Sequence, residues 1–161
     1  MVAKRESVKY KICALIALLI AAYSIFYVFS SYRNERYFSC LAQHHVHNNN
    51  VRSNMLMRFI FNGDTGMVSL DGEFINEQGH HKIISRKIIF DFTIDKKNYL
   101  LNSRMIIPSV FDEIDEHTIP RLLDNFYTQE RRPAVYQIHY NGKGGYIFMN
   151  DNAPYLLCAS N

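Results

Sequence analysis

Residues 84–94, ISRKIIFDFTI, carry the pattern that decides the fold of this 161-residue chain. Apolar side chains fall on one face of this segment if it is extended, and they are Ile84, Ile88, Phe90, Phe92 and Ile94. Polar side chains fall on the other face, and they are Ser85, Lys87, Asp91 and Thr93. Because successive side chains of a strand point to opposite faces, this alternation predicts a half-buried β-strand.

Three neighbouring segments show similar patterns, and with the first they form the series 55–61, 67–76, 84–94 and 99–107. Turn residues separate them at 62–66, 77–79 and 95–98. This arrangement predicts four consecutive antiparallel strands joined by hairpins.

A helix is predicted after the four strands, with Thr118 as its N-cap and Pro120 in its first turn. Its apolar stripe consists of Ile119, Leu122, Leu123, Phe126 and Tyr127. Three further strands follow at 135–140, 146–150 and 155–159. The predicted fold class is therefore α+β, a mainly antiparallel sheet or half-barrel of about seven strands with one packed helix.

The N-terminal part contains a candidate membrane segment. Residues 12–29, ICALIALLIAAYSIFYVF, contain Ser24 as their only clearly polar residue, and Ser30 to Tyr32 extend the run. Eighteen helical residues span about 27 Å, close to the ~30 Å hydrocarbon layer. A cleaved signal peptide is the alternative, but its apolar region is typically shorter.

These features divide the chain into four parts. We predict a cytoplasmic stub at 1–11, a transmembrane helix at 12–32, a juxtamembrane linker at 33–50 and a periplasmic α+β domain at 51–161. The linker is polar and rich in His and Asn, and its first residues are compatible with a helix.

Charge indicates the topology. Of the 18 Lys/Arg and 15 Asp/Glu, four basic residues and one acidic residue lie in the stub, so residues 33–161 carry 14 of each. The excess of basic residues before the apolar run places the N-terminus in the cytoplasm and the rest outside the inner membrane. A neutral outer domain offers no basic face, so no nucleic-acid partner is expected.

Two cysteines bracket the outer domain. Cys40 follows the membrane segment, and Cys158 lies near the C-terminus. In an oxidising periplasm they are expected to form a structural disulfide, and metal binding by two such distant thiols is the weaker interpretation. Within the membrane segment, Cys13, Ala17 and Ala21 follow an i, i+4, i+8 spacing that allows another helix to pack closely, although small residues are common in any apolar helix.

Several of these features together resemble a known family. They are the basic stub, the single membrane segment, the flanking cysteines, the hairpin with Phe61, Gly63 and Gly66, and the strand with Ser85, Arg86, Ile88 and Phe90. In this combination the chain resembles the FidL-like inner-membrane proteins of enteric bacteria. The resemblance implies a ToxS-like accessory protein that binds and stabilises or tunes a membrane-anchored, ToxR-type transcription regulator.

Candidate catalytic and metal sites have simpler explanations. Asp64-Thr65-Gly66 matches the aspartic-protease triplet but lies in a predicted turn. His44, His45 and His47 could bind a metal or respond to pH, yet they lie in the polar linker without a clear fourth ligand. The acidic run Asp112, Glu113, Asp115 and Glu116 is expected at the surface, where it could contact a partner. No enzymatic activity and no cofactor are predicted.

Two functions remain open at this stage. The first is an accessory protein that contacts its regulator partner through the small-residue helix face and an exposed strand edge. The second is a periplasmic sensor that binds an apolar small molecule in a cup formed by strands at 55–107 and 134–159. Phe90, Phe92 and Phe148 would line this cup.

Overall fold

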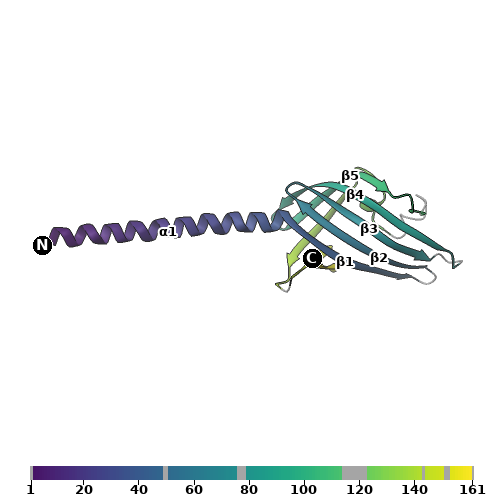
Figure 1. The fold of residues 1–161 in the computed structure, drawn as a ribbon, viewed down its shortest axis with the longest axis horizontal. Helices are drawn as coiled ribbons and strands as arrows, with labels where there is room; N and C mark the ends of the chain where they lie inside the picture. Colours follow the sequence, from purple (N-terminus) through teal and green to yellow (C-terminus); the bar gives the residue numbers. More distant parts are fainter. Residues whose placement is uncertain are drawn as a thin grey trace. The chain divides into compact units, whose positions relative to one another are not determined.

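The computed structural model describes residues 2–48, 51–75, 79–113, 123–142, 144–150 and 153–160, with the backbone alone described for 2–9, 46–48 and 51. Two compact units are present, Met1–Arg36 and Tyr37–Asn161. The first unit is helical and the second is a β-barrel (Figure 1).

The first unit is the single helix α1, Val2–Arg36. Its part from Tyr10 to Arg36 is long and apolar enough to cross a membrane, and none of its most apolar stretch is buried. The helix therefore includes the predicted segment 12–32 and extends beyond both of its ends. A helix satisfies its own backbone hydrogen bonds, which is the condition for a stable segment in lipid.

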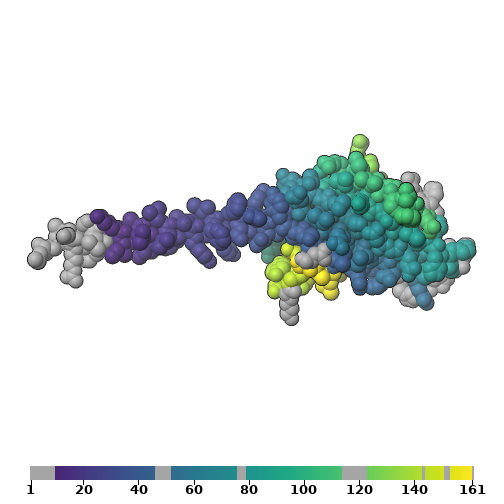
Figure 2. Space-filling model, viewed as in Figure 1, coloured from purple at the N-terminus to yellow at the C-terminus, as the bar shows by residue number. Residues whose placement is uncertain are grey.

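The second unit is an antiparallel barrel in which each strand pairs with the next and β8 pairs with β1. Its elements are β1 Tyr37–Asn48, β2 Val51–Asn62, β3 Thr65–Ile75, β4 His81–Asp95, β5 Asn98–Pro108, η2 Asn125–Tyr127, β6 Pro133–Tyr140, β7 Gly145–Asn150 and β8 Ala153–Ser160. The four predicted hairpin strands are confirmed as β2 to β5. Figure 2 shows the barrel face formed mainly by β1 to β5, coloured blue to green.

The predicted half-barrel is thus a closed barrel, and its additional strand comes from the predicted linker at 33–50. That stretch contains the end of α1 and all of β1, so neither the linker nor a helical start beyond Arg36 is correct. Phe38, Cys40 and Ala42 alternate as buried residues along β1. Two of these three side chains are small, and polar residues follow them in the sequence. The alternation of apolar and polar residues that indicates a strand is therefore weak here.

The predicted helix at 118–127 lies largely outside the described residues, including Thr118 and Pro120. Its described end, Asn125–Tyr127, is a 3₁₀ turn in which the Asp124 carboxylate accepts a hydrogen bond from the Phe126 N–H at 3.0 Å. Phe126 and Tyr127 are buried as predicted.

Aromatic side chains fill the barrel between its walls. Phe61 lies 5.4 Å from Phe90 and 5.1 Å from Phe92, and Phe59 lies 4.8 Å from Phe148, measured between ring centroids. An eight-stranded barrel has an interior just wide enough for its own side chains to fill. These rings therefore connect opposite walls into one hydrophobic core.

Candidate interaction surface

The barrel closes through a short seam between its first and last strands. Only three pairs join β1 to β8 among the described residues: Cys40 with Ser160, Leu41 with Ala159, and Ala42 with Cys158. By contrast, β1 pairs with β2 along its whole length, from Tyr37 to Asn48. We call the three pairs the β1–β8 seam.

The predicted disulfide lies at this seam. Cys40 and Cys158 are bonded, with their Cα atoms 5.3 Å apart and 118 positions apart in the sequence. Both side chains are buried. The disulfide therefore joins the first and last strands of the barrel, where the backbone ladder has few pairs, and it holds the barrel closed.

Beyond the seam, β1 presents an open edge. The β1–β8 ladder ends at Ala42, so residues 43–48 have no β8 partner in the part of the chain that the structure describes. Two features of the β7–β8 pair lie near the place where the β1–β8 ladder ends. Pro154 of β8 lacks an N–H, and the β7–β8 ladder is irregular between Phe148 and Met149. In an antiparallel strand about every second residue directs its backbone groups to one side, so this edge has backbone donors and acceptors without a ladder partner among the described residues. We call residues 43–48 the open edge.

Loops of the chain itself pair with the parts of β4 and β5 that extend beyond their neighbouring strands. Ser103 of β5 exchanges backbone hydrogen bonds with residues 131 and 132, at 2.7 and 3.0 Å. The Ser109 N–H donates to the Ser85 carbonyl at 2.8 Å, and the Glu113 N–H donates to the Ile83 carbonyl at 2.9 Å. By contrast, no loop in the described part of the chain pairs with residues 43–48 of β1.

A buried ion pair between Arg86 and Asp112 holds the loop that follows β5 against β4. Arg86 lies on the inner face of β4, and its guanidinium donates to both carboxylate oxygens of Asp112, at 2.8 and 2.7 Å. Their side chains are 6% and 2% exposed. The prediction of a surface position is thus wrong for Asp112, because its charge is neutralised inside the barrel. Glu113 is exposed as predicted, and Asp115 and Glu116 lie outside the described residues.

Two inward-facing polar groups, one on the open edge and one on the neighbouring strand, have no hydrogen-bond partner within the described part of the chain. They are Nδ1 of His44 on β1 and Oγ of Ser53 on β2. His44 packs against the Tyr155 ring at 5.8 Å between centroids. Burial, and secondarily the charge of His45, lowers the pKa of His44 below its ordinary value. The expectation that His44 belongs to a solvated linker is therefore wrong, whereas His45 is exposed.

A cluster of three tyrosines, Tyr155, Tyr136 and Tyr127, extends from His44 into the barrel. Tyr155 stacks on Tyr136 at 5.7 Å, and the hydroxyl of Tyr136 shares a buried hydrogen bond of 3.1 Å with that of Tyr127. Burial raises the pKa of both Tyr127 and Tyr136, so these phenols stay neutral. The cluster connects β6, β8 and η2 behind the open edge.

The Asp64-Thr65-Gly66 triplet comprises the last residue of the turn between β2 and β3 and the first two residues of β3. Gly66 is buried opposite Phe90, and a Cβ atom at this position would overlap the Phe90 ring. Packing therefore accounts for the glycine, the turn accounts for Asp64, and Thr65 begins β3 opposite Asn62.

A groove of about 410 Å³ lies over β1, β2 and β3, and Gln43 is the lining residue that it shares with the open edge. Its lining residues are Gln43, Asn54, Met55, Leu56, Asp71, Gly72 and Glu73. The Asp71 carboxylate already accepts hydrogen bonds from the hydroxyls of Ser69 and Ser85, at 2.8 and 2.9 Å. Across the described residues, no group of three His, Cys, Asp or Glu side chains could hold a metal ion. The side chain of His47 is not among those described.

The remaining predicted residues lie as follows. Cys13, Ala17 and Ala21 are exposed on α1, and Cys13 is a free thiol. Phe90, Phe92 and Phe148 face the barrel interior as predicted, but they pack against other rings of the core. A ligand at their level would have to displace part of this core.

Sequence comparisons connect the barrel to one family. The family described as "YqeJ C-terminal domain" matches residues 37–158, which run from the first residue of β1 to the second cysteine of the seam. A protein of Escherichia coli (strain K12) described as "Uncharacterized protein YqeJ" is 25% identical over 149 residues, covering 89% of this chain and 93% of that protein. No solved structure is significantly similar.

Proposed function

The chain belongs to the YqeJ C-terminal domain family, and we propose that it is a single-pass inner-membrane accessory protein. In this proposal its barrel lies in the periplasm and binds the outer part of a membrane-anchored transcription regulator, which it stabilises or tunes. An apolar helix that could cross a membrane and a disulfide are features of membrane or secreted proteins. The basic stub favours a cytoplasmic N-terminus.

The open edge of β1 is the observation that carries this proposal. An unpaired strand edge is a template for pairing with another chain, and natural proteins usually cover such edges. Here the chain covers the β4 and β5 edges through residues 109–113 and 129–132, while no residue that the structure describes pairs with the outer edge of residues 43–48. An extended segment of a partner could add to this edge and place a side chain in the neighbouring groove, where Gln43 belongs to both.

The membrane helix supplies the second contact of the proposal. Cys13, Ala17 and Ala21 lie on one side of α1, and small residues at this spacing allow the backbone of a second helix to approach closely. Two weak contacts on one chain reinforce each other, because binding through the first raises the effective concentration for the second.

In vivo crosslinking of the tagged full-length protein, followed by mass spectrometry of what it retains, tests the proposal. We expect recovery of a single-pass regulator with a cytoplasmic DNA-binding domain. The variant Ala17→Leu should reduce this recovery several-fold, whereas Ala22→Leu, the same change on the opposite side of the helix, should leave it unchanged. If no such regulator is recovered, the accessory function is wrong, and the apolar-ligand alternative becomes the next to test.

A further inference from the structure

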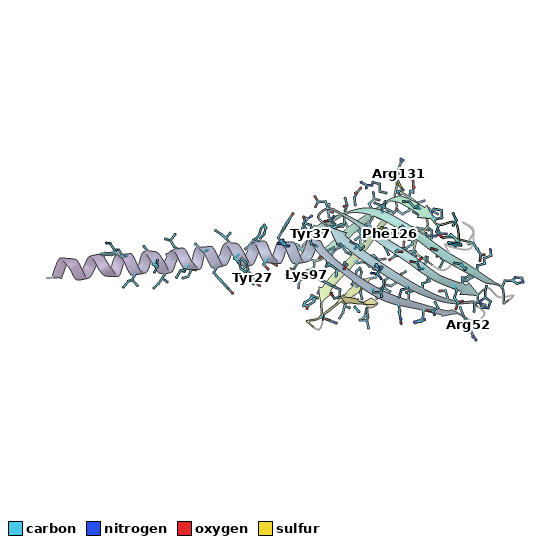
Figure 3. The ribbon with its side chains drawn as sticks, viewed as in Figure 1. Tyr27, Tyr37, Arg52, Lys97, Phe126 and Arg131 are labelled. Carbon is cyan, nitrogen blue, oxygen red and sulfur yellow. A yellow bond between two sulfur atoms is a disulfide. The ribbon has the colours of Figure 1, made fainter. Side chains whose placement is uncertain are left out.

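One end of the barrel combines residues suited to a membrane surface. Because neighbouring strands run antiparallel, the start of β1 at Tyr37 lies at the same end as the turns Gly63–Asp64, Lys96–Lys97 and Asn141–Gly142. We call this the basal end. Figure 3 shows Tyr37 and Lys97 at the basal end and Arg52 at the opposite end of the barrel.

Four side chains of the basal end are amphipathic and exposed, and they lie near the exposed carboxylates Asp64 and Asp95. Tyr37 is 50% exposed and Tyr140 is 62% exposed. Lys96 and Lys97 occupy the tip of the β4–β5 hairpin and are exposed as well. Tyrosine rings favour the boundary between lipid and water, and lysine places its ammonium group among phosphates while its methylene groups cover apolar surface.

Chain connectivity also limits how far Tyr37 can lie from the end of the apolar run. Helix α1 ends at Arg36 and β1 begins at Tyr37, with no residue between them. Tyr37 follows Tyr32, the end of the apolar run, by about 7–8 Å at the helical rise. The headgroup layer on each side of a bilayer is about 5–7 Å thick. If α1 spans the bilayer, as the proposed function requires, Tyr37 therefore lies at the outer boundary of that layer.

We propose that the basal end binds the anionic membrane surface. The ammonium groups of Lys96 and Lys97 contact lipid phosphates, and the rings of Tyr37 and Tyr140 lie among the headgroups. This contact holds the barrel close to the membrane. The open edge begins six residues after Tyr37, so a partner segment that pairs with it must lie within about 20–35 Å of the membrane, given the rise per residue of a strand.

Fluorescence quenching by spin-labelled headgroups tests this inference on the full-length protein. The Cys13→Ser variant is reconstituted into nanodiscs of phosphatidylcholine with or without phosphatidylglycerol, and a fluorophore is placed on Asp64→Cys at the basal end. The matched probe is Val110→Cys, which lies in the turn after β5 at the opposite end and is 92% exposed in the native chain.

We expect at least threefold stronger quenching at position 64 than at position 110 in anionic nanodiscs. Lys96→Glu/Lys97→Glu should reduce the quenching at position 64 by half or more. Arg52→Glu/Arg131→Glu, an equal change of charge away from the basal end, should not reduce it. Equal quenching at the two probes, or equal effects of the two double variants, would overturn the inference. If the protein instead separates from the nanodiscs in high salt, α1 does not span the bilayer and the proposed function fails as well.

Discussion

Removal of the Cys40–Cys158 disulfide tests how the barrel is held closed. The bond joins β1 to β8 beside a ladder of three residue pairs, whereas β1 and β2 are paired over their full length. Without it, the seam depends on a few backbone hydrogen bonds and on core packing. We therefore expect the double variant Cys40→Ala/Cys158→Ala to fold into a barrel that is markedly less stable and that opens first at the seam.

The magnitude follows from the length of chain that the bond closes. A loop of 118 residues corresponds to a loss of unfolded-state entropy that stabilises the fold by about 4–5 kcal/mol. For a barrel of roughly 125 residues, this is a decrease of about 15–20 °C in the unfolding temperature. Truncation of the two buried side chains adds a smaller loss, which a comparison with the chemically reduced native protein separates from the loop effect.

Urea unfolding of the full-length protein in detergent measures this loss. Because the chain contains no Trp, near-ultraviolet circular dichroism of the buried tyrosines is the appropriate probe. Hydrogen exchange should increase first at residues 40–42 and 158–160, the two sides of the seam. A loss below about 1 kcal/mol would refute the entropic argument, and uniform acceleration of exchange along all strands would refute the weak-seam interpretation.

Three further perturbations have defined outcomes. Asp112→Ala leaves the Arg86 guanidinium buried without its partner and should lower the free energy of unfolding by about 3–5 kcal/mol in urea titrations, whereas Arg86→Met/Asp112→Leu should lower it much less. Because burial lowers the pKa of His44 in the folded barrel below its ordinary 6.5, the unfolded chain binds this proton more readily, so stability should fall as the pH drops below about 6.5 and level off below the folded pKa. Unfolding midpoints at pH 7.5 and 5.0 should show a smaller difference for His44→Phe, and an unchanged difference would contradict this assignment. Tyr127→Phe leaves the Tyr136 hydroxyl without its buried partner and should cost about 1–3 kcal/mol by thermal unfolding, so a neutral effect would show that another group satisfies that hydroxyl.

The sequence predicted those parts of the fold that depend on local patterns. Strands β2 to β5 alternate large apolar residues with polar ones, and short turns connect them, so their existence and order follow from periodicity. The disulfide could be predicted because the two cysteines that flank the outer domain had each other as natural partners.

The closure of the barrel and its internal ion pair could not be predicted in the same way. Strand β1 contributes the small residues Cys40 and Ala42 to the core, and the half-buried His44 follows them, so its pattern resembles that of a polar linker. Arg86 interrupts an apolar face, and only the three-dimensional structure brings Asp112 to it from beyond the end of β5. Both features depend on contacts between residues far apart in the sequence, which local periodicity does not encode.

Site-specific photocrosslinking from the open edge tests the central claim most directly. A photoreactive residue is placed at His45, which is exposed on the open edge of β1, or at Thr93, which is exposed on β4. Both variants are expressed as full-length protein in cells that contain the regulator. We expect position 45, and not position 93, to crosslink the outer domain of a membrane-anchored regulator. Equal crosslinking from both positions, or none from position 45 when the protein is folded and in the membrane, would contradict the claim that residues 43–48 bind the partner.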